Sequence, residues 1–78
     1  MFLVIKLFIE VSVSGKFTAN FSIFENNGPE LKIIPYYLDK EFDNKDEAYN
    51  LAKREVLSTI MKKYPQGTKY KIENKETN

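Results

Sequence analysis

The residues best placed to do chemistry are the carboxylates of residues 39–43, Asp-Lys-Glu-Phe-Asp, which stand at alternate positions. Alternating carboxylates open the calcium-binding loop of the EF-hand type. Such a loop also needs a glycine at its sixth position and a bidentate glutamate at its twelfth, where this chain has Asn44 and Asn50. We therefore predict no metal ion here and interpret the segment as a solvated connector that leads into a helix.

Nucleophilic catalysis lacks its usual partners in this chain. There is no histidine, so none of the serines, at positions 12, 14, 22 and 58, has the base that normally activates a hydroxyl. There is no cysteine either, which excludes thiolate metal ligands and disulfides. The three glycines form no phosphate-binding pattern. We therefore predict that the protein is not an enzyme and uses no cofactor.

Length and composition indicate one small globular domain. The 78 residues are near the lower limit for a core that has no disulfide or metal to support it. Hydrophobic residues make up 42% of the chain and charged residues 29%, a balance typical of folded rather than disordered proteins. The net charge of +1 is too small to indicate a polyanionic partner by itself.

The N-terminal stretch does not have the pattern of a targeting or membrane segment. Its apolar run, from Met1 to Val13, is interrupted by Lys6 and Glu10 and is too short to span a bilayer. No basic region precedes the run, as one would in a signal peptide. We therefore expect a cytoplasmic protein with no membrane partner.

Residues 44–64 carry the only convincing helical pattern. Asn44 is placed to cap the N-terminus, with Glu47 three residues later to complete a capping box, and Asp43 with Asp46 is the other frame for the cap. A Pro-Gln-Gly sequence ends the helix. The apolar side chains that share one half of the helical wheel are Ala48, Tyr49, Ala52, Val56, Ile60 and Tyr64.

Two segments before the helix alternate between apolar and polar side chains, as strands with one buried face do. These are residues 2–13 and 16–24, both with their apolar side chains at odd positions. A three-residue loop from Val13 to Gly15 keeps both apolar sets on one face and puts the glycine where a left-handed backbone is wanted. The predicted pairs are Val11 with Phe17, Ile9 with Ala19, Leu7 with Phe21 and Ile5 with Ile23.

A third strand is expected from about Glu30, after the turn sequence Asn-Asn-Gly-Pro at 26–29. In this interpretation Leu31 and Ile33 continue the apolar core face. A bulge or bend is then predicted near Pro35, because the side chains beyond it have the opposite parity. Those side chains are Ile34, Tyr36 and Leu38.

The C-terminal part of the chain predicts one further element. Residues 68–72 alternate again and indicate a short edge strand guarded by its lysines. Residues 75–78 are expected to be a disordered tail that follows a single domain of residues 1–74. The predicted class is therefore α+β, with a three-stranded antiparallel meander, one long helix packed on one sheet face and a short C-terminal edge strand, in the order β-β-β-α-β.

One helix cannot cover both faces of such a sheet, so the even-numbered face is expected to stay open. Aromatic side chains on an open sheet expose more apolar surface than a solitary monomer usually does. We predict that this face binds another protein, first of all a second copy of the chain in a homodimer. The residues expected to form this interaction face are Phe2, Val4, Lys6, Phe8, Phe24 and Tyr36, with Ile34 beside them.

Nucleic acid is the alternative partner. Aromatic side chains with Lys6 on a sheet are what base stacking needs. Separately, the segment Phe42 to Ala48 resembles the strand-to-helix joint of small bacterial α+β domains, double-stranded-RNA-binding folds among them. Acidic residues interspersed along the helix nevertheless favour an ordinary solvated outer face over a phosphate-binding one. The basic residues on that outer face are Lys45, Lys53, Arg54, Lys62 and Lys63.

Overall fold

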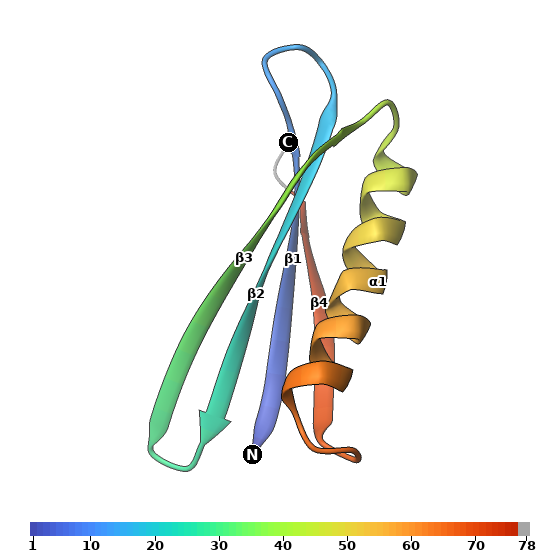
Figure 1. Cartoon of the computed structure of the whole chain (residues 1–78). Coiled ribbons are helices and arrows are strands. Elements are labelled where there is room, and N and C mark those ends of the chain that lie inside the picture. The colour runs from blue at the N-terminus through green and yellow to red at the C-terminus, as the bar shows by residue number, and fades with distance from the viewer. Residues whose placement is uncertain (77–78) are drawn as a thin grey trace.

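The computed structural model describes residues 1–76, and the side chains of residues 1–74, as one sheet with a helix on it (Figure 1). The sheet order is β3-β2-β1-β4, with β1, β2 and β3 antiparallel and β4 parallel to β1. The α+β class and the order β-β-β-α-β are thus confirmed. The elements are β1 (Phe2–Val11), β2 (Phe17–Asn27), β3 (Glu30–Phe42), α1 (Lys45–Lys63) and β4 (Lys69–Glu76).

The C-terminal strand is longer than the sequence pattern indicates. Strand β4 runs from Lys69 to Glu76 and therefore includes residues 75–76, the first two residues of the predicted tail. The other two, residues 77–78, lie outside the described residues. The edge position predicted for this strand is confirmed, because β1 is its one neighbour within residues 1–76.

The first hairpin has the predicted loop and register. The Ser12 N–H donates to the Lys16 carbonyl at 2.7 Å, which closes a loop of three residues, and the Gly15 N–H donates to the Ser12 carbonyl at 2.9 Å. Gly15 has a φ of 85°, a left-handed backbone that favours glycine. The pairs Ile9 with Ala19 and Leu7 with Phe21 follow, so both apolar sets lie on one face as predicted.

The second hairpin reverses the expected parity of β3. Its loop contains only Gly28 and Pro29, since Asn27 pairs with Glu30. Gly28 has a φ of 68°, and a glycine with positive φ at the first of two loop positions is typical of a tight II′ turn. A two-residue loop pairs odd positions with even ones. The predicted core placement of Leu31 and Ile33 is therefore wrong, and Ile34, Tyr36 and Leu38 face the core.

The irregularity in β3 lies further along the strand than predicted. Pro35 pairs regularly with Ser22, and the register shifts instead between Thr18 and Ala19, which pair with Glu41 and Leu38. Two residues of β3 are inserted there, and an insertion of two preserves the alternation of faces. Residues 39–42 thus belong to β3, so most of the predicted connector is strand and only residues 43–44 join β3 to α1.

The helix begins and ends as its sequence predicts. The Glu47 N–H donates to Asn44 Oδ1 at 2.9 Å, and Asn44 Nδ2 donates to Glu47 Oε1 at 3.1 Å, so Asn44 is the N-cap. Acidic side chains in the first turn and lysines in the last complement the helix dipole. The Tyr64 N–H closes the last turn on the Ile60 carbonyl at 3.1 Å. No helix within residues 1–76 is long and apolar enough to cross a membrane.

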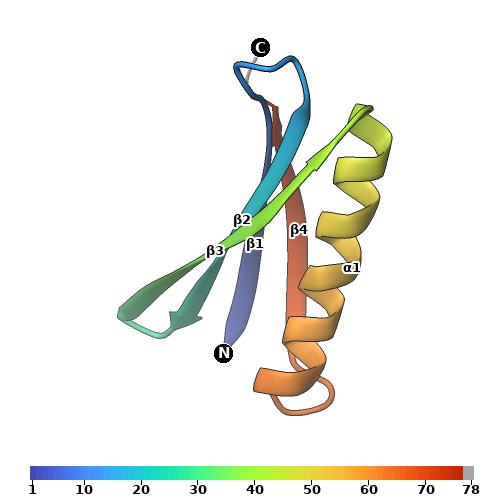
Figure 2. The ribbon, with the colours of Figure 1, turned by 45° about the horizontal axis from the view of Figure 1, so that its top comes forward.

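The core lies between α1 and one face of the sheet, and the other face carries no layer in residues 1–76 (Figure 2). Ala48 and Ala52 are fully buried, and their small side chains let the helix axis approach β1 and β2 closely. No polar or charged side chain among those described is buried. The buried side chains are Leu3, Ile5, Leu7, Ile9, Ala19, Phe21, Ile23, Ala48, Ala52, Val56 and Ile60.

We expect Ile60→Ala to lower the free energy of unfolding by about 2–4 kcal/mol, because it removes buried methyl and methylene groups and leaves a cavity. Ile60 is only 7% exposed and packs with Val56 in the core. The control is Arg54→Ala on the exposed side of α1, where we expect a change within about 0.5 kcal/mol. Urea denaturation followed by circular dichroism measures both. Equal stabilities for the two variants would contradict the assigned helix face.

Candidate interaction face

The sheet face opposite α1, here called the open face, is built from cross-strand rows of side chains. Even positions of β1 pair with even positions of β2 and with odd positions of β4. Even positions of β2 pair with odd positions of β3. Paired residues point to the same face. The rows, read from β3 to β4, are Leu31-Asn26-Phe2-Lys69, Ile33-Phe24-Val4-Lys71, Pro35-Ser22-Lys6-Glu73, Tyr37-Asn20-Phe8 and Glu41-Thr18-Glu10.

Apolar side chains on this face are exposed to an unusual extent. Tyr37 is 78% exposed, Leu31 57%, Ile33 53% and Phe2 41%. Three further apolar side chains of the face, Val4, Phe8 and Phe24, are half-buried. Exposed apolar side chains that are scattered need no explanation, but a contiguous apolar patch marks a binding surface.

The charges on the open face are mixed and partly neutralised. The Lys6 ammonium lies 4.7 Å from the centre of the Phe24 ring, a cation–π contact that keeps it over apolar surface. Lys71 forms an ion pair with Glu73 at 3.1 Å. Lys69 stands beside Phe2 across the strand pair. Positive charge therefore lies on the β4 side of the face, and the apolar side chains lie toward β3.

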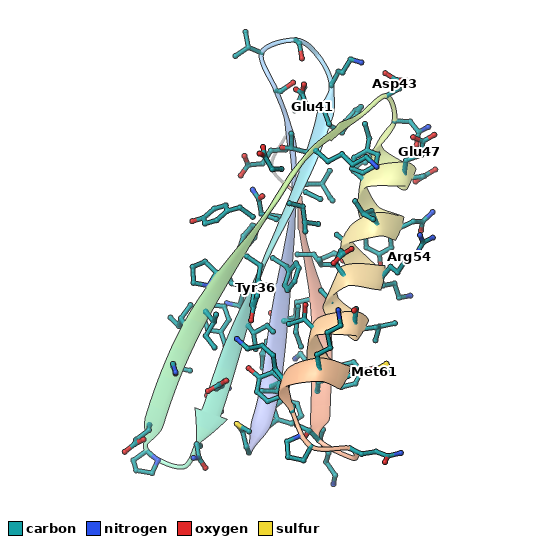
Figure 3. The ribbon with its side chains drawn as sticks, viewed as in Figure 1. Tyr36, Glu41, Asp43, Glu47, Arg54 and Met61 are labelled. Atoms are coloured by element: carbon teal, nitrogen blue, oxygen red, sulfur yellow. The ribbon has the colours of Figure 1, made fainter. Side chains whose placement is uncertain are left out.

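Five of the six predicted interaction residues come together on the open face. The sixth, Tyr36, is labelled in Figure 3. It does not lie on the open face, so the prediction that placed it there is wrong. Tyr36 pairs with Phe21 across β2 and β3, and the two rings stack with centroids 4.8 Å apart on the helix-covered face. The two-residue loop at Gly28 reverses the parity of β3 and moves Tyr36 there. The five placed together are Phe2, Val4, Lys6, Phe8 and Phe24.

Sequence reasoning missed the contributions of β3 and β4 to the open face. The side chains missed are Leu31, Ile33, Pro35 and Tyr37 from β3, and Lys69, Lys71 and Glu73 from β4. A signal for the β3 group exists in the Gly-Pro pair of the second turn, because a glycine followed by proline fits a two-residue loop and so fixes the parity. Local sequence contains no such signal for β4, whose placement depends on the crossover through α1.

A hollow of about 230 Å³ interrupts the open face. The open-face side chains that line it are Phe8, Glu10, Asn20, Ser22, Pro35 and Tyr37. Such a depression beside a projecting tyrosine gives the face relief that a partner can fit.

A polar cluster on the opposite face attaches the C-terminal end of α1 to the sheet. The Tyr64 hydroxyl donates a hydrogen bond to Glu25 of β2. Lys63 Nζ donates to the Tyr36 hydroxyl at 2.8 Å, and Tyr36 in turn stacks on Phe21. The cluster therefore ties the end of the helix to β2 and β3.

Both donors in this cluster hold their protons more tightly than usual. Burial raises the pKa of Tyr64 above its ordinary value, and the hydrogen bond to Glu25 with its negative charge adds to this. The hydrogen bond to Tyr36 is the main cause that raises the pKa of Lys63. A nucleophile or general base needs its pKa lowered toward neutrality. The cluster thus suits attachment rather than proton abstraction.

Two of the alternating carboxylates of residues 39–43, those of Glu41 and Asp43, contact the first hairpin. Glu41 accepts a hydrogen bond from Ser14 Oγ at 3.3 Å, and Asp43 pairs with Lys16 at 3.2 Å, which links the end of β3 to the first hairpin (Figure 3). Within the described part of the chain, no group of three or more side chains that could ligate a metal ion comes together.

The fold and the open face define a small two-layer α+β domain in which one helix covers one sheet face. Comparison of the chain with protein-family models, with curated proteins and with solved structures found no match. Its function is therefore inferred from its own geometry and chemistry.

We expect Tyr64→Phe to lower the free energy of unfolding near neutral pH by about 1–2 kcal/mol, because it removes the hydrogen bond to Glu25. The free energy of unfolding of the variant should also fall less than that of the wild type as the pH rises. The pKa of Tyr64 is raised in the folded state, so its contribution is complete below the unfolded value of about 10 and is lost as the pH rises above it. Urea denaturation from pH 8 to 11 measures this, and parallel pH profiles for the two proteins would contradict the assigned role.

Proposed function

We propose that the protein is a small non-enzymatic interaction domain that self-associates as a homodimer through the open face. The observation that carries this proposal is the group of exposed apolar side chains, Phe2, Leu31, Ile33 and Tyr37, on a sheet face that α1 does not cover. Small domains often supplement a thin core by oligomerising. Packing this face against a second copy would remove from water the side chains that the fold leaves exposed.

The size of the open face is adequate for a stable dimer. Four strands about 4.8 Å apart, each about ten residues long at about 3.3 Å per residue, span on the order of 600 Å² in projection. A standard interface buries about 800 Å² of accessible surface on each partner, and accessible surface exceeds projected area. The face is therefore near the size that a specific association needs.

The relief of the open face supports a self-complementary contact. Tyr37, the most exposed aromatic side chain on the face, lines the hollow together with Asn20 and Ser22. In a two-fold dimer each surface meets its own copy, so the Tyr37 of one protomer can enter the hollow of the other. An aromatic anchor in a pocket is the arrangement that dominates many interfaces.

Two observations favour a binding role over an enzymatic one. The sequence has neither histidine nor cysteine, so the commonest general base and the strongest nucleophile are missing. The pKa values of Lys63 and Tyr64 are raised, and both shifts stabilise the protonated form. The chemistry that the described side chains do offer is apolar contact area.

We expect the protein to be a dimer at micromolar or higher concentration and Ile33→Asp to be a monomer, because a carboxylate beside Phe24 in the apolar patch cannot be buried without cost. Ile33 is 53% exposed in the monomer, so the substitution should leave the fold intact. Arg54→Asp, on the exposed side of α1, is the control and should remain a dimer. Sedimentation velocity measures the mass of all three. A wild-type monomer at millimolar concentration would refute self-association.

Single-stranded nucleic acid is a second candidate partner, and one observation favours it. Strand β4 places Lys69 and Lys71 on the open face beside Phe2 and Val4, which brings cations next to an exposed aromatic ring. Aromatic side chains with neighbouring cations are what base stacking and phosphate contact require.

We expect the nucleic-acid candidate, if correct, to give a monomer that binds a labelled oligothymidylate, with affinity that falls as salt rises. Lys69→Ala should then weaken binding and lower its salt dependence, whereas Lys62→Ala on the helix should do neither. Fluorescence anisotropy at two salt concentrations measures this. No binding at low salt would remove the candidate and leave the homodimer proposal unaffected.

A further inference from the structure

The turn between β2 and β3 holds two neighbouring residues that can react with each other. Asn27 is followed by Gly28, and no other asparagine in the sequence precedes a glycine. The backbone nitrogen of the residue after an asparagine can attack the side-chain amide carbon, because the two atoms can close a succinimide ring. A Cβ on the following residue hinders this attack, and glycine has none. The Asn27-Gly28 pair is therefore the most reactive asparagine sequence in the chain.

Both residues lie at an exposed end of the sheet. Asn27 is the last residue of β2, and residues 26–33 are all exposed. Figures 1 and 2 show this end of the β2–β3 hairpin projecting away from α1. Among the described residues, no atom lies within 4 Å of the position that a Cβ at Gly28 would occupy, apart from its chain neighbours. The space around the attacking nitrogen is therefore open to water.

The backbone pairing holds Asn27 less firmly than it holds residues deeper in the sheet. Asn27 pairs with Glu30 at the last position before the loop, and Gly28 lies outside the register. A paired strand residue has an extended backbone, which turns the next nitrogen away from the side-chain amide. Ring closure therefore requires this last pair to open. Pairs with exposed backbone hydrogen bonds at the end of a hairpin are the ones that open at the lowest free-energy cost.

We propose that Asn27 is a site of spontaneous deamidation and that this modification loosens the end of the β2–β3 hairpin. The Gly28 nitrogen attacks Asn27 Cγ, so that an N–Cγ bond forms and the Cγ–Nδ2 bond breaks. The proton of the Gly28 nitrogen goes to the leaving nitrogen, which departs as ammonia. Water then opens the succinimide, either at Cγ to give aspartate or at the main-chain carbonyl carbon to give isoaspartate. The sum is asparagine plus water to a carboxylic acid plus ammonia, with no oxidation or reduction.

The aspartate product changes the charge of the last pair. Its carboxylate stands opposite Glu30 across the two strands. Like charges directly opposite each other on neighbouring strands destabilise the pair. A charge-changing modification of this kind acts through local repulsion. The end of the hairpin should therefore open more often after the reaction than before it.

The isoaspartate product has a larger effect because it lengthens the main chain. The chain then runs through the former side-chain carbon, which adds one backbone atom just before Gly28. The two-residue loop depends on tight turn geometry, in which Gly28 has a φ of 68°. A longer chain cannot keep both this turn and the pair beside it. The loss of pairing adjoins Leu31 and Ile33, but the reaction itself does not involve the open face, so it does not depend on the homodimer.

The test keeps the full folded chain at pH 8 and 37 °C and samples it over several weeks. Peptide mapping by mass spectrometry, with fragmentation that distinguishes isoaspartate from aspartate, measures conversion at each asparagine. We expect both products at residue 27, formed at least tenfold faster than any product at Asn26, which is equally exposed but precedes an asparagine. Incubation in oxygen-18 water should label the new carboxylate. Conversion at residue 27 that is no faster than at Asn26 would overturn the proposal.

Matched proteins separate the effect of the charge from that of the longer chain. Hydrogen exchange is measured on the purified isoaspartate form, on fresh Asn27→Asp, and on Asn27→Ser after the same incubation, since serine has no amide to lose. We expect the amides of residues 25–32 to exchange at least tenfold faster in the isoaspartate form, by a smaller factor in Asn27→Asp, and at the unmodified rate in Asn27→Ser. The amides of α1 should stay within twofold in all three.

Two results would contradict the second half of the proposal. Unchanged exchange of residues 25–32 in the isoaspartate form would show that the hairpin tolerates the longer chain. Equal acceleration in incubated Asn27→Ser would assign the loosening to a reaction at another residue.

Discussion

A single helix can cover only one face of a four-stranded sheet, and this limit determines most of the molecule. The buried side chains of the described residues come from α1 and from the strand positions that face it. Ala48 and Ala52 give the helix a narrow, close contact along β1 and β2. Because strand side chains alternate, half of each strand must point away from the helix. The polarity of the side chains that point away from the helix decides whether that face can bind a partner. The aromatic rings of Phe2, Phe8 and Phe24 give it apolar surface.

The crossover from β3 through α1 to β4 gives the sheet two dissimilar edges. Strand β4 returns parallel to β1, so Ile72 joins the core face beside Ile5 while Lys69 and Lys71 join the open face. The cations of the open face thus come mainly from β4, and its apolar side chains come from β1, β2 and β3. On β3 the proline at position 35 and the register shift discourage further pairing, whereas the regular β4 has only its charges for protection.

Much of the fold could be predicted from local chemistry, and the failures have two physical sources. The first hairpin follows from the apolar alternation and Gly15, and the helix start follows from Asn44, because each depends on residues close in sequence. The face of Tyr36 depends on whether the second loop holds two residues or three. A change of one residue there reverses every side chain of β3. The position of β4 depends on contacts across the whole chain, which no local pattern encodes.

The attachment of α1 explains why the helix does not cover β4. Tyr64 binds Glu25 and Lys63 binds Tyr36, so the C-terminal half of the helix is held toward β2 and β3. A helix held there cannot also cover β4, and Tyr70 is left exposed beside it. The same contacts that complete the core over β2 and β3 therefore leave β4 outside the strands that the helix contacts.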